Sequence, residues 1–357
     1  MSDANRAIVP LGQRVIVASV NRQFAITEKL VGSIQTAQNL FDVFNVPLDG
    51  SFEEAIDKIR PNGLITIAAG RYILEAGVTI TKPLRIKGAG RNESIIESSV
   101  AGTILCVETD GLFELEHIGI VRTGEQRGDL LSITTSKVHV NSCALVGPGI
   151  TLIGGGHWFK GIRLAGKTIG IVNDTTVACC LTGIGIEGNA EINVHDSHFK
   201  ENISGISFSD HAIGTAENNI CSRNIGSGII VRGISEVLLI GNSCKENANY
   251  GIFFQPSATG TAKNNICSQN KYTGIYVRAH STVHLIGNRC EENGSAGISF
   301  SEPASGIVEK NICRLNKKKG ISIKQVNPST VFLNNNVCEG NGEWNMNKEL
   351  ADVGIGF

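Results

Sequence analysis

Few residues of this chain have the type and spacing that chemistry requires. The densest group of titratable side chains is His195-Asp196-Ser197-His198. Histidine suits proton transfer near neutral pH and metal binding, but two histidines three positions apart on a strand point to opposite faces of a sheet. They fit one metal site only if a turn separates them. A surface turn is therefore the simpler interpretation of this group.

Three further motifs carry titratable groups. His157 stands in a glycine-rich run, residues 154–158, which indicates a loop. The lysine run at 317–319 precedes a glycine and indicates a solvated turn. Glu187 and Asp210 stand 23 positions apart, which is the repeat length described below. Two carboxylates on neighbouring turns of a fold can act as acid and base in glycoside hydrolysis.

A strip of aromatic, cationic and amide residues is the remaining candidate. Its predicted ligand-binding members are Arg232, Phe253, Gln255, Tyr276, Arg278 and His280. Aromatic rings can stack on sugars, and guanidinium groups bind carboxylates through paired hydrogen bonds. On an enzymatic interpretation, the catalytic candidates are Glu187, Asp210, Arg232, Arg278 and His280. Packing between exposed strands and solubility explain the same residues without a ligand.

These residues belong to a repeat of 23 residues that is regular from Gly205 onward. A glycine followed by isoleucine recurs at Gly205, Gly228, Gly251, Gly274, Gly297 and Gly320. A cysteine recurs at Cys221, Cys244, Cys267, Cys290, Cys313 and, after a two-residue insertion, Cys338. Asparagine stands two residues before and three residues after each of these cysteines. Repeats of this length indicate a solenoid or a related array.

Each repeat contains two runs of alternating residues, such as Ile206-Ser207-Phe208 and Thr215-Ala216-Glu217, which predict strands. A strand-turn-strand-turn unit stacks on its predecessor at about 4.8 Å, the spacing of hydrogen-bonded strands. If Ile206 and Phe208 point inward, Ser207 points outward. The predicted outward columns are Gly185, Ser207, Ile230, Phe253, Tyr276, Ser299 and Ser322, and Glu187, Ser209, Arg232, Gln255, Arg278, Ser301 and Lys324.

The asparagine columns predict ladders of side-chain amides that satisfy one another at the bends between strands. The cysteine columns predict small buried side chains inside turns, because free cysteine often packs as a small hydrophobe. We expect reduced thiols, since we read no export signal at the start of the chain. The pattern also lacks the C-x-x-C pairs of zinc sites. We therefore expect no metal ion and no cofactor.

The composition argues against nucleic acid and membranes as partners. A net charge of −1 with 18% charged residues provides no basic field for nucleic acid. No window approaches 18 uninterrupted apolar residues, so we expect a cytoplasmic protein with no membrane partner. The 42 glycines and the 5% of aromatic residues suit short strands joined by tight turns.

Residues 51–90 resemble the start of right-handed parallel β-helices of the pectate-lyase-like superfamily. The resemblance rests on the segments FEEAI at 52–56, ITIAAGRY at 65–72 and ITKPLRIKGAG at 80–90. The first segment predicts an amphipathic capping helix that begins at Ser51. The later repeats look like the carbohydrate-binding and sugar-hydrolase β-helix family, which is also described as periplasmic copper-binding-protein-like.

The resemblance covers residues 51–341 and implies a fold rather than a reaction. Related lyases use arginine or lysine as a base with calcium held by aspartates, and related hydrolases use paired carboxylates on neighbouring turns. This chain lacks the paired aspartates and the glycine-flanked histidine motif of the hydrolases.

We predict an all-β chain, a right-handed single-stranded parallel β-helix over residues 51–341. An N-terminal capping extension at 1–50 and a C-terminal cap at 342–357 complete the predicted organisation. Two functions remain open. The first is a binding or scaffold protein that presents an outer sheet groove to a saccharide or a protein. The alternative is a polysaccharide-active enzyme, a lyase, hydrolase or epimerase, that uses the same groove.

Overall fold

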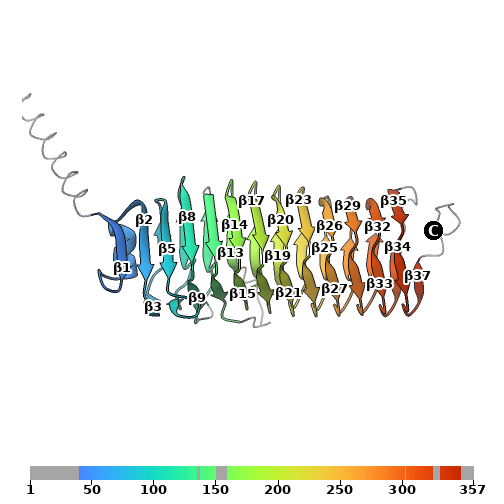
Figure 1. Ribbon diagram of the computed structural model, residues 1–357, viewed down its shortest axis with the longest axis horizontal. Coiled ribbons are helices and arrows are strands. Elements are labelled where there is room, and N and C mark those ends of the chain that lie inside the picture. Colours follow the sequence, from blue (N-terminus) through green and yellow to red (C-terminus); the bar gives the residue numbers. More distant parts are fainter. Residues whose placement is uncertain are drawn as a thin grey trace, which may run out of the picture.

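The computed structural model describes residues 40–124, 126–134, 137–149, 159–301, 303–324 and 330–346. These residues form one elongated solenoid, in which strands from successive turns stack along the long axis (Figure 1). The described strands pair in parallel throughout, and the coil is right-handed. The predicted fold class is therefore confirmed. No helix of the described part is long and apolar enough to cross a membrane.

Each full turn of the solenoid, here called a rung, contributes one strand to each of three sheets. Sheet A contains β1 (Phe41–Val46), β2 (Ile59–Ile67), β5 (Leu84–Gly88), β8 (Leu112–Glu116), β11 (Lys137–Asn141), β14 (Ile169–Asn173), β17 (Glu191–His195), β20 (Ile213–Glu217), β23 (Glu236–Ile240), β26 (Thr259–Lys263), β29 (Thr282–Ile286), β32 (Ser305–Glu309) and β35 (Val331–Asn334). Sheet B contains β3 (Gly70–Leu74), β6 (Ser94–Ser98), β9 (Gly119–Arg122), β12 (Ala144–Val146), β15 (Thr176–Ala178), β18 (His198–Lys200), β21 (Ile220–Ser222), β24 (Ser243–Lys245), β27 (Ile266–Ser268), β30 (Arg289–Glu291), β33 (Ile312–Arg314) and β36 (Val337–Glu339). Sheet C contains β4 (Val78–Ile80), β7 (Leu105–Glu108), β10 (Leu131–Thr134), β13 (Lys160–Ala165), β16 (Thr182–Ile186), β19 (Ser204–Phe208), β22 (Ile229–Val231), β25 (Ile252–Phe254), β28 (Ile275–Val277), β31 (Ile298–Ser301), β34 (Lys319–Lys324) and β37 (Trp344–Met346).

Three strands per rung is one more than the sequence pattern predicts. The additional strand lies in sheet B and carries the cysteine at its centre, as in β21 and β24. The prediction that the cysteines lie inside turns is therefore wrong, because a strand of three residues is too short to show an alternating pattern. Their predicted burial is confirmed: the cysteines from Cys221 to Cys313 are fully buried, and Cys338 is half-buried.

Helix α2 (Phe52–Lys58) packs at the first rung, where the sequence predicts a capping helix. The hydroxyl of Ser51 accepts a hydrogen bond of 3.2 Å from the backbone N–H of Glu54. The Glu54 carboxylate accepts a hydrogen bond of 2.9 Å from the backbone N–H of Ser51. This reciprocal pair satisfies two donors that the first turn of a helix would otherwise leave free.

The predicted terminal caps lie largely outside the described residues. Residues 41–46 of the predicted N-terminal extension form β1, which pairs with β2 as the first strand of sheet A. Residues 1–39 and 347–357 are not described. The predicted domain boundaries therefore stay predictions.

Two asparagine ladders run along the described solenoid, as predicted. The ladder between sheets A and B contains Asn219, Asn242, Asn265, Asn288, Asn311 and Asn336. The ladder between sheets B and C contains Asn224, Asn247, Asn270, Asn293, Asn316 and Asn341. Each amide nitrogen but the last of a ladder donates to the side-chain oxygen on the next rung, at 2.9–3.0 Å.

The second ladder explains the repeated glycine. A Cβ atom added at Gly251 would lie 2.6 Å from the carbonyl oxygen of Gly274 and 3.0 Å from the amide nitrogen of Asn270. Real Cβ atoms do not approach a backbone oxygen so closely. Glycine at this place therefore lets the chain pass against the ladder on the following rung.

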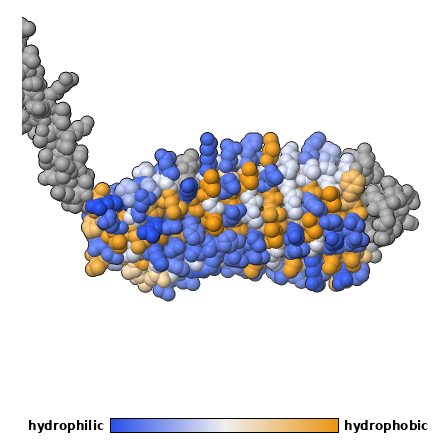
Figure 2. Space-filling model, turned by 45° about the horizontal axis from the view of Figure 1, so that its top comes forward, coloured by the Kyte–Doolittle hydropathy of each residue, from blue (hydrophilic) through white to orange (hydrophobic). Residues whose placement is uncertain are grey.

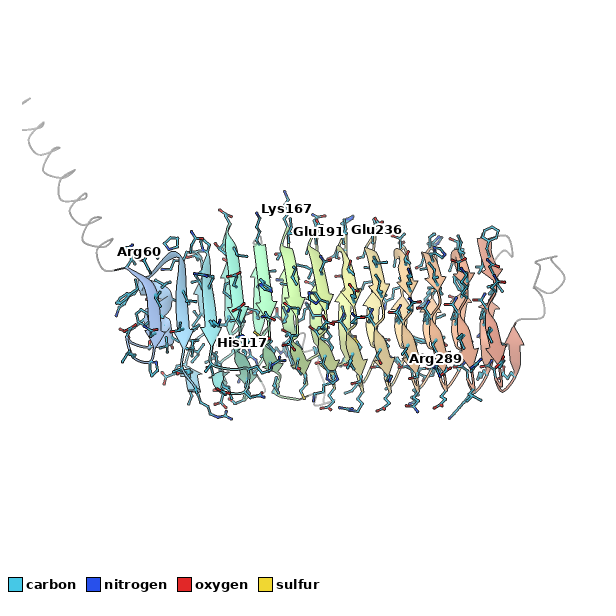
Figure 3. The ribbon with its side chains drawn as sticks, viewed as in Figure 1. Arg60, His117, Lys167, Glu191, Glu236 and Arg289 are labelled. Atoms are coloured by element: carbon cyan, nitrogen blue, oxygen red, sulfur yellow. The ribbon has the colours of Figure 1, made fainter. Side chains whose placement is uncertain are left out.

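Hydrophilic and hydrophobic areas alternate on the outer surface along the solenoid (Figure 2). Charged side chains such as Lys167, Glu191 and Glu236 extend outward at one edge of the stack (Figure 3). Long apolar side chains are also exposed on the outer face of sheet A, including Ile169 and Ile213. Single exposed apolar residues of this kind are normal on a protein surface.

Candidate functional site

The outer face of sheet C carries the predicted outward columns. Strand pairing places Ser207, Ile230, Phe253, Tyr276, Ser299 and Ser322 opposite one another on six consecutive strands. The register is uninterrupted because each of these rungs has the same number of residues before the strand. The predicted register of the column is confirmed, although its three serines are buried rather than exposed. Along the column the side chains change from serine through Ile230 to the aromatic pair and back to serine.

Four aromatic residues gather where the column is aromatic, and we call them the aromatic block: Tyr250, Phe253, Tyr272 and Tyr276. The rings of Phe253 and Tyr276 are stacked, with centroids 5.3 Å apart and planes 11° apart. Tyr250 lies over both of them, at 4.8 Å from Phe253 and 4.9 Å from Tyr276, and Tyr272 lies 6.0 Å from Tyr250. Burial raises the pKa of the Tyr250 phenol.

A depression of about 260 Å³ adjoins the aromatic block, and we call it the hollow. Its floor is the rung that carries Ser295, Ala296 and Ser299, whose side chains are small. Tyr272 and Tyr276 line it from the preceding rung. Large side chains on the rungs before and after a rung of small ones leave a depression about two rung spacings wide, or roughly 10 Å.

Lysines line the opposite side of the hollow. Lys318, Lys319 and Lys324 contribute to the lining from the rung that follows the floor, and Glu343 contributes from the rung after that. The order is fixed by the backbone: the N–H of Ser295 donates to the carbonyl of Tyr272, and the N–H of Lys318 donates to that of Ser295, each at 2.9 Å. None of these three lysines forms an ion pair with another described residue.

A buried hydroxyl also contributes to the hollow. Ser322 is 3% exposed, and its oxygen has no hydrogen-bond partner among the described residues. A buried polar group without a partner costs roughly 1–3 kcal/mol. A ligand that hydrogen-bonds to this hydroxyl would remove that cost.

The six residues predicted to bind a ligand do not form a single cluster in the structure. Phe253 and Tyr276 belong to the aromatic block. Arg232, Gln255 and Arg278 follow strands β22, β25 and β28 directly, and they are three members of the second predicted column. His280 lies apart from them, in the bend beyond β28, with a positive φ of 58°. The roles assigned to these residues stay predictions.

Sequence reasoning missed Tyr250, Tyr272, Lys318 and Lys319 as residues of this surface. The two tyrosines lie in the bends before β25 and β28, where alternation predicts nothing. A compositional signal was available, since three of the four tyrosines in the chain fall between positions 250 and 276. The prediction that the lysine run is only a solvated turn overlooked the fact that Lys318 and Lys319 face the small rung before them.

The candidate catalytic carboxylates lie elsewhere on the surface. β16, which Glu187 follows, is four strands away from β28 in sheet C, or roughly 19 Å. The carboxylate of Glu187 binds Lys160 at 2.9 Å and Arg163 at 3.0 Å. Burial by itself raises the pKa of Glu187, but these two cations outweigh it and hold the pKa below its ordinary value. Asp210 accepts a hydrogen bond of 3.1 Å from the backbone N–H of Gly188.

The histidine cluster is the surface turn that the sequence predicts. Asp196 has a positive φ of 51° and separates strands β17 and β18. His195 contacts Asp196 at 2.9 Å, whereas His198 contacts Ser222 at 3.0 Å. Among the described residues, no group of three or more His, Cys, Asp or Glu side chains could hold a metal ion. His157 lies outside the described residues.

Solved structures with the same fold include proteins that act on polysaccharides. The A-module of the Azotobacter vinelandii mannuronan C-5 epimerase AlgE4 is 14% identical, with a TM-score of 0.62 over 80% of this chain and 89% of that module. The catalytic unit of an α-1,3-glucanase from Streptomyces thermodiastaticus is 14% identical, with a TM-score of 0.54 over 84% and 67%. The Dettilon tailspike protein is 14% identical, with a TM-score of 0.58 over 83% and 69%. These likenesses show a shared fold.

No curated protein sequence matches the chain. A family model described as right handed beta helix region matches residues 119–288 and 204–355, which together exceed half of the chain. The matched residues contain the regular rungs, both asparagine ladders and the hollow. The chain therefore belongs to the family of right-handed β-helix regions.

Proposed function

We propose that this protein binds a saccharide chain on the outer face of sheet C and that one sugar ring occupies the hollow. The main support for this proposal is that the stack of aromatic rings ends at Tyr276. Phe253 and Tyr276 are stacked on neighbouring rungs, and the next residue of the column is Ser299. The face of Tyr276 that turns away from Phe253 therefore borders an open space of ring size.

The chemistry of the lining suits a sugar. The apolar face of a pyranose can lie against Tyr276, as aromatic rings in binding sites commonly do with flat apolar partners. Serine hydroxyls at positions 295, 299 and 322 can exchange hydrogen bonds with ring hydroxyls. The lining of the hollow is more polar than apolar, and convergent polar groups beside an aromatic ring are the groups that fix the orientation of a bound ligand.

The comparisons support a saccharide over a protein partner. Two of the structures that share the fold are named as an epimerase of mannuronan and an α-1,3-glucanase. A protein partner would also require a larger contact surface, since stable interfaces bury about 800 Å² on each side. The hollow is far smaller than that and has the dimensions of a small-ligand site.

On this face, no contact among the described residues points to the enzymatic alternative. Glu187 pairs with Lys160 and Arg163, and Asp210 accepts a hydrogen bond from the backbone N–H of Gly188 on the preceding rung. Both carboxylates lie several rungs from the hollow. We therefore propose binding rather than turnover as the activity of this face.

The proposal can be tested by a substitution that fills the hollow with an aromatic side chain. In the variant Ser299→Phe, the new ring should continue the stack of Phe253 and Tyr276. The purified variant and the parent protein are compared on immobilised hyaluronan, polygalacturonate and dextran by biolayer interferometry. We expect the parent to bind at least one of the three and the variant to lose at least about 90% of that binding.

The matched control is Thr261→Phe, which adds the same ring to the outer face of sheet A. We expect this variant to bind as the parent does. Undiminished binding by Ser299→Phe, with a circular dichroism spectrum like that of the parent, would exclude the hollow as the site. Absence of binding to all three polymers by the parent would contradict the proposed function itself.

A further inference from the structure

We infer that the ligand is an acidic polysaccharide with one negative charge per disaccharide, and that Arg232, Arg278 and Lys324 bind successive charges along it. The inference rests on the proposed saccharide site. It adds the chemical class of the ligand and the direction in which it lies, along the axis of the solenoid.

The three cations belong to one column on the outer face of sheet C. Phe254 pairs with Val277, and Phe300 pairs with Val277 and Ile323. The residues that follow these positions are therefore neighbours in register. In order along the column they are Arg232, Gln255, Arg278, Ser301 and Lys324.

Charge alternates along this column with a period of two rungs. Cations stand at the first, third and fifth places, and the neutral residues Gln255 and Ser301 stand between them. Two rungs span about 10 Å, which is about the length of two sugar units in an extended chain. A polymer with one carboxylate per disaccharide therefore presents its charges at the spacing of the cations.

The repeat of Arg232 at Arg278 alone would be explained by copying, because these rungs are alike at other positions as well. Lys324 is a different residue, and it stands seven positions before Val331, whereas Arg278 stands five positions before Val283, although Val331 and Leu333 repeat Val283 and Leu285 in register. A positive charge is nevertheless present at the same place. At this position of the column, the three rungs thus share the charge rather than the residue.

Ion pairing distinguishes these three cations from other cations in the described part of the chain. All three side chains are exposed, and none forms an ion pair with another described residue. Other arginines on the solenoid do so, such as Arg223 with Glu201 at 3.1 Å and Arg289 with Glu291 at 2.6 Å. A row of cations that form no ion pair with the described residues, beside an aromatic wall, favours an external anion.

The hollow lies at the lysine end of this row. Lys324 belongs both to the column and to the lining, together with Lys318 and Lys319. The single lining carboxylate named above, Glu343, does not balance three ammonium groups. The unpartnered hydroxyl of Ser322 can donate to a carboxylate of the ring that lies on Tyr276. The ring in the hollow is therefore one of the acidic units.

A polymer with a charge on every sugar fits less well. Every second carboxylate would face Gln255 or Ser301, which can form hydrogen bonds but cannot neutralise a charge. A carboxylate beside Gln255 or Ser301 gains a neutral hydrogen bond at most, whereas a carboxylate beside a cation gains a stronger, charge-assisted one. The column therefore discriminates by spacing as well as by sign.

The test compares three polymers by biolayer interferometry at low and at moderate salt. Hyaluronan carries one carboxylate per disaccharide, polygalacturonate carries one per sugar, and dextran carries none. We expect the parent protein to bind hyaluronan at least about tenfold more tightly than polygalacturonate and dextran most weakly. Binding of hyaluronan should weaken as salt rises, because the contacts are between exposed charges.

The variant Arg232→Gln, Arg278→Gln, Lys324→Gln removes the row of charges. Its matched control, Lys137→Gln, Lys245→Gln, Lys263→Gln, removes three exposed lysines from sheets A and B. The first triple variant should lose at least about tenfold in affinity for hyaluronan, roughly the sum of three exposed ion pairs, and the second should lose less than about twofold.

The outcomes separate this inference from the proposed function. Equal or tighter binding of polygalacturonate, or equal losses in the two triple variants, would overturn the inference about charge spacing. If dextran binds as tightly as hyaluronan while Ser299→Phe abolishes binding of both, the saccharide site stands and its acidic ligand class is wrong. If none of the polymers binds, both fail.

Discussion

The side-chain nitrogen of Asn265 donates a hydrogen bond of 2.9 Å to the side-chain oxygen of Asn288 on the next rung. The same nitrogen donates to the backbone carbonyl of Leu239 at 2.9 Å. The side-chain oxygen of Asn265 accepts from the backbone and the amide nitrogen of Asn242, at 2.9 Å each. One fully buried side chain thus takes part in four hydrogen bonds that join three rungs.

Replacing this side chain should destabilise the solenoid strongly. In Asn265→Ala, the backbone N–H of Asn242 and the carbonyl of Leu239 lose partners in the interior. Because unpaired buried polar groups are costly, we expect the free energy of unfolding to fall by about 2–4 kcal/mol. Urea denaturation followed by circular dichroism measures it. The control Asn189→Ala, at an exposed bend, should change stability by less than about 0.5 kcal/mol.

Alkaline pH should destabilise the protein through its buried thiols. Burial raises the pKa of Cys143 from 9.0 to about 12, and it also raises the pKa of Cys221 and Cys267. A group whose pKa is higher in the folded state stabilises that state below the unfolded-state pKa, and the contribution is lost as pH rises. The window for Cys143 is therefore pH 9 to about 12.

The comparison of the parent with Cys143→Ser isolates this effect. Between pH 9 and pH 11, the parent should lose up to about 1.4 kcal/mol per pH unit more than the variant, which lacks the titrating thiol. Unfolding curves in urea at pH 8, 9, 10 and 11 give the two slopes. Parallel slopes would mean that Cys143 ionises in the folded protein near its ordinary pKa.

The Glu187 carboxylate should contribute to stability rather than to turnover. Glu187→Gln leaves Lys160 and Arg163 without the carboxylate that pairs with both, and we expect a loss of about 1–2 kcal/mol at pH 7. Because the pKa of Glu187 is lowered in the folded state, its contribution is present above the unfolded-state pKa of about 4.5 and is lost as pH falls below it. The variant and the parent should therefore differ less at pH 3 than at pH 7.

Glu201→Gln serves as the control for that measurement, because the pair of Glu201 with Arg223 is about half exposed. Exposed pairs contribute little, so this variant should stay within about 0.5 kcal/mol of the parent at both pH values. If Glu187→Gln is as stable as Glu201→Gln, the ion-paired role assigned to Glu187 is incorrect.

The repeat made the fold predictable from the sequence, because identical residues in a fixed register reveal stacking directly. Gly251 and Asn270 recur with their counterparts at 23-residue intervals, and the structure shows them in contact across rungs. The third strand of each rung was not predicted because the strand around Cys221 is only three residues long. Alternation needs a longer segment to be visible.

The hollow could not be predicted in the same way. It exists because Ser295 and Ser299 are small where the preceding rung carries Tyr272 and Tyr276. A depression is a property of differences between rungs, whereas repeat analysis detects what rungs share. The position of Tyr250 over two rings of other strands also depends on the geometry of a bend, which alternation does not describe.

Tyr276 forms one wall of the hollow, and Arg278 is the cation beside it. Replacing Tyr276 and Arg278 together by alanine removes the ring against which the sugar is proposed to lie and the central cation of the column. Both side chains lie on the outer face of sheet C, and Tyr276 is half-buried by the aromatic block rather than by the core. We expect the free energy of unfolding to change by less than about 1 kcal/mol and hyaluronan binding to weaken by about 1–4 kcal/mol.

The single variant Tyr276→Phe gives the finer test of stacking. It keeps the ring and removes only the hydroxyl, which donates a hydrogen bond of 3.3 Å to Ser301. If the ring face supplies the affinity, Tyr276→Phe should bind within about threefold of the parent, since a neutral hydrogen bond contributes only about 0.5–1.5 kcal/mol. Isothermal titration with hyaluronan oligosaccharides measures both variants, and an unchanged affinity in the double alanine variant would remove Tyr276 and Arg278 from the site.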